Sequence, residues 1–191
     1  MTDAQTRVYA ATYESVARVG LDKTTLESIA TAAGISRATL YRMFPGGRDQ
    51  VLRETVGVEM DRFFIALAAE ISDAPDLETC LELGLIFARH SLLEHSVLQK
   101  VLRTEPETLL PLMTVEQHRI VAAIAEYLVP LITAEKSRLR SGLNPVRAAE
   151  YVAGMVLSII GSPGRWDLND PKEVHTLVRE ELLAGVLDPN A

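Results

Sequence analysis

The chain has one cysteine, few aromatic residues and no apolar run long enough to span a membrane as a helix. Cys80 alone excludes an intrachain disulfide, as is usual for proteins of reducing compartments. The N-terminus lacks the apolar stretch of a signal peptide. We therefore expect a cytoplasmic protein. Because Cys80 lies in an apolar helical pattern, we expect an inert core thiol rather than a redox sensor.

The patterns of common enzyme sites are missing as well. No two of the four histidines (His90, His95, His118 and His175) are four residues apart, so no HExxH-type pair exists. There is no Cys–His motif around Cys80 and no glycine-rich phosphate loop. We therefore expect no catalytic residues, no metal site and no cofactor.

Apolar residues make up 48% of the 191 residues, which is typical of a globular protein and too high for a disordered one. No segment has the pattern of a credible strand. Helical periodicity predicts an all-α fold of about nine helices. The expected helices span residues 3–19, two short helices within 25–43, then 48–71, 77–92, 95–103, 107–139, 145–161 and a last helix that starts at Asp170-Pro171.

Several boundaries and faces of these helices carry specific signals. The helix after Gly20 is capped either by Thr24, in a capping box with Glu27, or by Thr25. Pro130 predicts a kink inside segment 107–139. Helix 145–161 is apolar nearly all round, which predicts that most of it is buried. The buried side of helix 48–71 is predicted to carry Val51, Leu52, Val56, Met60, Phe63, Phe64 and Leu67.

The most informative stretch is Thr25–Met43, which has the pattern of two short helices joined by a glycine turn. A helix-turn-helix needs a small residue where the helices touch, here Ala30, and a glycine where the chain reverses, here Gly34. The inner faces also need apolar residues at matched spacings, and Ile29, Ala33, Ile35, Leu40 and Met43 provide them. The combined spacing predicts a helix-turn-helix.

The second helix of this pair offers a polar outer face. Ser36 is a suitable N-cap, because its hydroxyl can accept a hydrogen bond from a free N–H of the first turn. The residues expected to face outward are Arg37, Ala38, Thr39, Tyr41 and Arg42. Arginine can bond guanine edges or phosphate, and threonine and tyrosine can bond phosphate. The face suits DNA, although a solvated polar surface is the alternative.

These residues resemble the TetR family of bacterial transcriptional regulators. The matching pattern is Thr25-Leu26-x-x-Ile29-Ala30-x-x-Ala33-Gly34-Ile35-Ser36-x-x-Thr39-Leu40-Tyr41-x-x-Phe44, followed by Arg48-Asp49-x-Val51-Leu52. The family usually has two residues and then Lys after the Phe. Here Pro45-Gly46-Gly47 makes the loop one residue longer, and Arg48 replaces the Lys. The expected DNA-contacting residues are Thr25, Ser36, Arg37, Ala38, Thr39, Tyr41, Arg42 and Arg48.

The resemblance implies a DNA-binding domain at 1–47 and a ligand-binding and dimerisation domain at 48–191. It implies a homodimer formed by the last two helices, a palindromic operator and repression relieved by a small molecule. From periodicity alone, the last two helices could equally close the core of a monomer. A helical protein-interaction scaffold that does not bind DNA is the alternative function.

A small-molecule pocket is a further implication of the resemblance. The candidate lining residues are Met60, Phe63, Phe64, Leu67, Phe87, His90, Met113, Gln117 and Met155. They are mostly apolar and soft, with a few polar groups, which suits a hydrophobic ligand. An ordinary helical core has the same composition, so packing is the alternative role of each residue.

The net charge of −7 is unevenly distributed along the chain. Residues 1–55 hold seven basic and six acidic side chains, a net charge of +1, which leaves −8 for the remainder. A near-neutral head with arginines at the motif can still dock on phosphate. The weak charge of the head predicts modest non-specific affinity for DNA.

Overall fold

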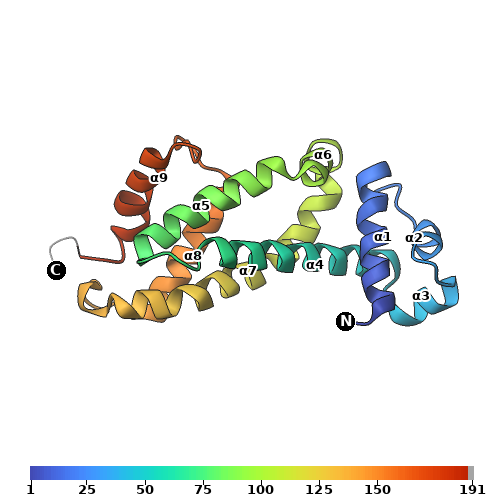
Figure 1. The fold of residues 1–191 in the computed structure, drawn as a ribbon, viewed down its shortest axis with the longest axis horizontal. Helices are drawn as coiled ribbons and strands as arrows, with labels where there is room; N and C mark the ends of the chain where they lie inside the picture. Colours follow the sequence, from blue (N-terminus) through green and yellow to red (C-terminus); the bar gives the residue numbers. More distant parts are fainter. Residues whose placement is uncertain (189–191) are drawn as a thin grey trace. The chain divides into compact units, whose positions relative to one another are not determined.

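The computed structural model describes residues 1–188, apart from the side chains of residues 115 and 116, and this part of the chain is helical (Figure 1). The α-helices are α1 (Asp3–Val19), α2 (Leu26–Ala32), α3 (Arg37–Met43), α4 (Gly47–Glu70), α5 (Leu77–Glu94), α6 (Ser96–Thr104), α7 (Pro106–Ala134), α8 (Pro145–Gly161) and α9 (Pro171–Leu177). A 3₁₀ turn (Lys136–Arg138) follows α7, and a π-helical segment (Val178–Leu183) continues α9.

The all-α prediction of about nine helices is confirmed for the described residues. Their only β-type pairing is an isolated antiparallel bridge between Leu139 and Leu187. None of the described helices is long and apolar enough to cross a membrane. Residues 189–191 of the predicted C-terminal domain lie outside the described residues.

Local side-chain chemistry determines most helix starts. Asp76, Asn144 and Asp170 each accept a hydrogen bond from a backbone N–H in the first turn of α5, α8 and α9, as predicted. The start of α2 decides between the two candidate threonines. Thr25 is the cap, and its capping-box partner is Ser28, not Glu27. Thr24 is fully buried and donates to the carbonyl of Gly20, at 2.7 Å.

Two burial predictions were wrong in part. In α4 only Val51, Leu52 and Thr55 are fully buried, and the predicted apolar residues from Val56 to Leu67 are half-buried. In α8 one face is buried, but Tyr151 is 46% exposed. Apolar periodicity reports which side chains avoid water and not how completely neighbouring helices cover them.

The helix α7 continues through Pro130 for four more residues, to Ala134.

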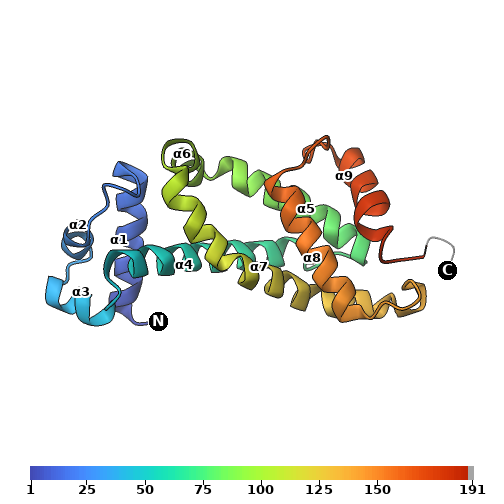
Figure 2. The ribbon, with the colours of Figure 1, turned by 180° about the vertical axis from the view of Figure 1, so that it is seen from behind.

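The chain divides into two compact units. Unit 1 comprises residues 1–65 and 95–116, and unit 2 comprises residues 66–94 and 117–191. In unit 1, helices α1, α2 and α3 lie together in both Figure 1 and Figure 2. They share a core built from Val8, Tyr9, Ala11, Ile29, Ala30, Ala33, Leu40, Phe44 and Val51. A second apolar cluster joins α1 and the start of α4 to α6 and α7 through Val16, Leu21, Leu52, Val101 and Leu109.

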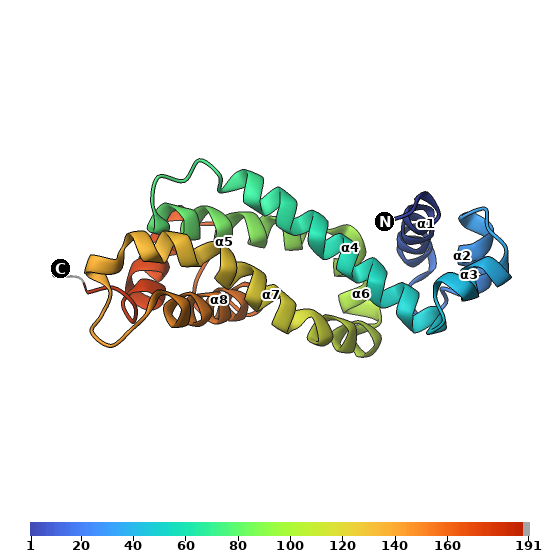
Figure 3. The same cartoon turned by 90° about the horizontal axis from the view of Figure 1, so that it is seen from below.

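Unit 2 has the larger core. Buried residues of α5, α8, α9, the π-helical segment and the second half of α7 contribute to it (Figure 3). Its fully buried members include Leu85, Ile132, Val152, Val174 and Leu182. The face of the last helix that was predicted to be buried, from Val174 to Leu182, is buried as expected. The predicted domain boundary at 47/48 follows the sequence motif and stays a prediction.

Candidate nucleic-acid interface

The turn between α2 and α3 is built around Gly34. Its φ of 66° lies in the left-handed region, which glycine adopts without steric cost. The N–H of Gly34 donates to the carbonyl of Thr31, and the N–H of Ile35 donates to the carbonyl of Ala30. This pair of bonds is a Schellman motif, and it satisfies carbonyls that the end of α2 would leave unpaired. The predicted glycine turn is therefore confirmed.

Ser36 caps the helix that follows the turn. Its hydroxyl accepts a hydrogen bond from the N–H of Thr39, at 3.1 Å, as predicted. Leu40 is fully buried, and Phe44 packs edge-on against Tyr9, with 5.9 Å between ring centroids. Each fully buried side chain of this size stabilises the fold by about 1.5–3 kcal/mol. The inner side of α3 is thus fixed against α1 and α2.

The opposite side of α3 faces solvent with the predicted residues. Arg37, Ala38, Tyr41 and Arg42 are exposed, and Thr39 is half-buried. The Arg37 side chain is 61% exposed, and Tyr41 is 46% exposed. The face therefore presents two guanidinium groups, two hydroxyls and one small residue from a single rigid helix. Such a set can reach both phosphates and base edges.

One neighbour of this face was not anticipated from the sequence. Oε1 of Glu27, on α2, lies 3.8 Å from a terminal nitrogen of Arg37. The two residues are ten positions apart and on different helices, so no local spacing rule connects them. The carboxylate places a negative charge beside the most N-terminal cation of α3.

Arg48 has partners inside the protein. Its Nε donates to the carbonyl of Thr24 at 2.8 Å, and an Nη donates to the carbonyl of Leu21. The side chain thereby ties the start of α4 to the loop before α2. Its predicted contact with phosphate stays a prediction, as do the contacts of the other seven DNA-facing residues.

A polar chain braces the loop between α3 and α4, which is one residue longer than in the family pattern. The N–H of Gly46 donates to Gln50, Gln50 donates to Glu54, and the Tyr9 hydroxyl donates to Glu54 at 2.6 Å. Burial and the neighbouring Glu54 carboxylate raise the pKa of Tyr9 to about 12. The phenol therefore stays protonated and keeps donating at neutral pH. This chain connects the loop to α1.

The C-terminal end of α1 is held by α6 and α7 within unit 1. Nζ of Lys100 donates to the carbonyls of Ala17 and Arg18, at 2.8 and 3.3 Å. The Glu105 carboxylate accepts from the N–H of Asp22, at 3.0 Å. It packs so closely on Gly20 that a Cβ there would lie 2.0 Å from its Oε1. The φ of 92° at Gly20 also lies in the region that favours glycine.

The N-terminal segment matches a known protein family. Residues 8–55 match the model of the bacterial regulatory proteins of the tetR family. The match spans most of α1, the helix-turn-helix and the start of α4. This domain belongs to the TetR family. No curated protein matches the chain in sequence.

Solved structures of transcriptional regulators, among them a TetR-family repressor, share the fold over nearly the whole chain. QsdR, a transcriptional repressor of R. erythropolis, has a TM-score of 0.65 and 18% identity over 98% of this chain and 97% of its own. FadR, a fatty acid degradation regulator from Bacillus halodurans, has a TM-score of 0.60 and 22% identity over 93% and 95%. SmeT, solved as a triclosan complex, has a TM-score of 0.59 and 20% identity over 98% and 93%. SmeT is the repressor of an efflux pump in Stenotrophomonas maltophilia.

The predicted ligand-lining residues divide between the two units. Unit 1 holds Met60, Phe63, Phe64 and Met113, all half-buried. Unit 2 holds Leu67, Phe87 and Met155, also half-buried, together with His90 and Gln117, which are exposed. The rings of Phe63 and Phe64 contact each other edge-on, with centroids 5.5 Å apart. The role of all nine in binding a ligand stays a prediction.

Proposed function

We propose that this protein is a sequence-specific DNA-binding transcriptional repressor of the TetR type. The observation that carries the proposal is the exposed face of α3 inside a TetR-family domain: Arg37, Tyr41 and Arg42 point outward from a helix whose other side is fixed in the core. A recognition helix needs this combination of rigid support and free hydrogen-bonding groups.

The chemistry of this face suits a duplex. The arginines can bond guanine O6 and N7 in the major groove, whereas the hydroxyls of Thr39 and Tyr41 can bond phosphate. The small side chain of Ala38 lets the helix backbone approach the bases. The rest of the chain carries a net charge of −8 and repels phosphate, so contact with DNA is restricted to the head.

We further propose that the protein acts as a homodimer through its last two helices and reads a palindromic operator. A two-fold dimer places two copies of α3 on half-sites one helical turn apart. The exposed part of α8, with Val146 at 52% and Tyr151 at 46% exposure, supplies uncovered apolar surface for this contact. An operator-binding protein of this type works in the cytoplasm.

A small-molecule effector that releases the operator is the third part of the proposal. SmeT was solved with triclosan, an apolar aromatic compound, and the candidate lining residues here are also mostly apolar. The continuous helix α4 begins in the TetR-family domain and ends in unit 2. A shift of its C-terminal end on effector binding would therefore be passed along the helix to the DNA-binding residues.

Selection of bound duplexes from a random DNA library tests the central claim. We expect the purified full-length protein to enrich one palindromic sequence at 100 mM salt. The Arg37→Ala, Tyr41→Ala double variant removes one cation and one hydroxyl from the face and should lose this enrichment. The matched control is Arg103→Ala, Tyr127→Ala, which removes the same groups from exposed positions on α6 and α7 and should keep it.

The outcomes separate DNA binding from the scaffold alternative. Enrichment that survives the loss of Arg37 and Tyr41 would mean that α3 is not the recognition helix. If no sequence is enriched by the wild type, with or without a panel of apolar compounds, the repressor proposal fails and a protein-binding role of the helical surfaces takes its place.

A further inference from the structure

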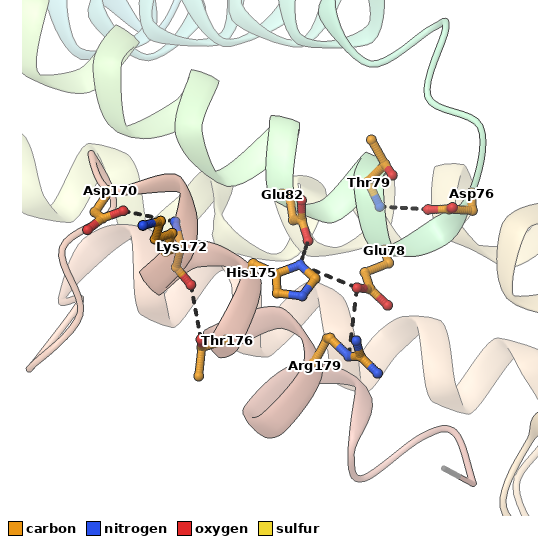
Figure 4. Close-up of polar contacts among 9 residues, drawn as sticks. All are labelled: Asp76, Glu78, Thr79, Glu82, Asp170, Lys172, His175, Thr176 and Arg179. Carbon is orange, nitrogen blue, oxygen red and sulfur yellow. Dashed lines mark hydrogen bonds and ion pairs between the residues drawn. The ribbon is translucent and has the colours of Figure 1, made fainter. Parts of the chain in front are cut away.

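A mixed cluster of carboxylates and imidazole lies in unit 2, away from the DNA-facing helix. Glu78 and Glu82 are one turn apart on α5, and His175 comes from α9 (Figure 4). One ligand atom from each residue lies within 4.8 Å of the other two. Nδ1 of His175 is 2.7 Å from Oε1 of Glu82 and 3.4 Å from Oε1 of Glu78. Three possible ligand atoms from two helices are therefore grouped in one place.

The two helices hold these donors in place. Below the cluster, Leu81 and Leu85 of α5 and Val174 and Leu177 of α9 are buried in one core. Both helix starts are capped by aspartates. The backbone positions of the three donors are thus fixed by packing that does not involve the donors themselves, which is what a preorganised ligand site requires.

The electrostatics favour an added cation. Two carboxylates one turn apart on a helix repel each other. Arg179 offsets this only in part, because its Nε is 3.8 Å from Glu78 and its side chain is 61% exposed. The side chains of Glu78 and Glu82 are themselves 34% and 24% exposed, so water screens their charges incompletely. A cation between them would relieve this repulsion.

We propose that Glu78, Glu82 and His175 bind a divalent transition-metal ion, with Zn²⁺ as the reference ion. One imidazole nitrogen and two carboxylate oxygens form a set that suits zinc and its neighbours, whereas Ca²⁺ and Mg²⁺ prefer oxygen alone. Water completes the coordination. A carboxylate only accepts hydrogen bonds, so the 2.7 Å contact between Nδ1 and Glu82 needs a proton on Nδ1, whereas metal binding at Nδ1 requires the tautomer that carries its proton on Nε2. The bound ion joins α5 to α9.

The sequence could not reveal this site. His175 and Glu82 are 93 residues apart, and neither helix carries a histidine pair at metal-binding spacing. The expectation of no metal site rested on such local pairs. The ordinary role of the same three side chains is a cross-helix ladder, in which Glu82 pairs with His175 and Glu78 with Arg179. The ladder and the metal site predict different responses to zinc.

Calorimetric titration of the full-length protein with ZnCl₂, after EDTA treatment and dialysis at pH 7.4, distinguishes them. We expect one zinc ion per chain and at least tenfold weaker binding by His175→Gln and by Glu82→Gln. The matched control His118→Gln removes another exposed histidine, on α7, and should bind zinc like the wild type. Arg179→Met removes the competing cation and should bind zinc at least twofold more tightly. MgCl₂ at the same concentration should give no saturable heat.

Thermal melts followed by circular dichroism provide the second measurement. Zinc should raise the melting temperature of the wild type and of His118→Gln but not that of Glu82→Gln, whose side chain keeps the size of glutamate. Zinc binding that is absent from the wild type, or equally tight in Glu82→Gln, would overturn the proposal. The test compares the wild type with the isosteric variant Glu82→Gln, so it remains valid even if His175→Gln fails to fold. None of these measurements involves DNA, so the proposed repressor function is tested separately.

Discussion

Arg37 has a carboxylate beside it on the face that we propose meets DNA. Glu27 lies 3.8 Å from the guanidinium and is itself exposed. We expect Glu27→Gln to raise the affinity for a duplex of unrelated sequence about threefold, because it removes a charge that repels phosphate and competes for Arg37. Fluorescence anisotropy with a labelled 20-base-pair duplex at 100 mM salt measures the change.

The control for this prediction is Glu126→Gln, which removes an exposed carboxylate from α7 in the other unit. It should leave the affinity unchanged. An affinity for Glu27→Gln equal to the wild type, or lower, would show that Glu27 orients Arg37 for binding rather than competing with DNA.

The buried thiol of Cys80 should make the free energy of unfolding depend on pH in the alkaline range. Burial, with a smaller contribution from Asp76, raises the pKa of its thiol to about 11. Because the folded-state pKa is raised, the contribution of the protonated thiol is complete below pH 9 and is lost as the pH rises toward 11. Between pH 8 and 10.5, we expect the unfolding free energy of the wild type to fall by roughly 2 kcal/mol more than that of Cys80→Ala.

Urea unfolding at the two pH values measures this difference. Each protein is compared with itself, so the stability lost to the cavity left by alanine is the same at both pH values and drops out. Equal losses in the two proteins would mean that the thiol titrates normally. The same burial predicts that iodoacetamide labels Cys80 only after unfolding, which agrees with the inert core thiol expected from the sequence.

Residue-level predictions succeeded where the signal was local. The caps Ser36, Asp76, Asn144 and Asp170 bond their own first turns, so three or four residues of sequence contain the whole interaction. The choice between Thr24 and Thr25 was not local. Thr24 is drawn into the core by Ser15 and the Gly20 carbonyl, and the sequence gives no sign of that packing.

At the scale of elements, α1 is held at its C-terminal end by a lysine from α6. Lys100 donates to the last carbonyls of α1, where a cation also interacts favourably with the helix dipole. We expect Lys100→Met, which keeps the apolar stem, to lower the free energy of unfolding by about 1–2 kcal/mol. Urea denaturation at pH 7 measures the change.

Lys136→Met is the matched control, because it removes an exposed lysine from the 3₁₀ turn and should change stability by less than about 0.5 kcal/mol. If the two variants are equally stable, the bonds from Lys100 contribute nothing net. A loss confined to Lys100→Met would establish that α6 supports the TetR-family domain.

Helix existence followed from sequence more readily than helix burial. The pattern of α1 and the Asn144-Pro145 start of α8 were sufficient to place both helices, since periodicity and capping are properties of the segment itself. The exposed side of α8 was missed because Tyr151 and Val146 look like core residues in the sequence. The cluster of Glu78, Glu82 and His175 was missed for the same reason: it depends on which helices become neighbours.

At the scale of the whole molecule, we expect the exposed side of α8 to form the dimer contact on which operator binding by the TetR-family domain depends. Tyr151 is 46% exposed, and the small exposed residues Gly154 and Ser158 follow it on the same face of α8, which leaves room for a partner helix to approach. A carboxylate there would be buried without a partner in the proposed dimer, which costs several kcal/mol. We therefore expect Tyr151→Glu to weaken dimerisation at least tenfold in sedimentation equilibrium.

Loss of the dimer should carry over to DNA, because each subunit reads only one half-site of a palindrome. Affinity of Tyr151→Glu for the selected operator should fall at least tenfold, whereas its affinity for an isolated half-site should match the wild type. Tyr127→Glu places the same charge at a 39% exposed tyrosine of α7 and should remain dimeric. A Tyr151→Glu protein that stays dimeric would move the interface away from α8. If the wild type is monomeric at micromolar concentration and binds a single half-site, the last two helices do not form a dimer interface and only close the core of unit 2.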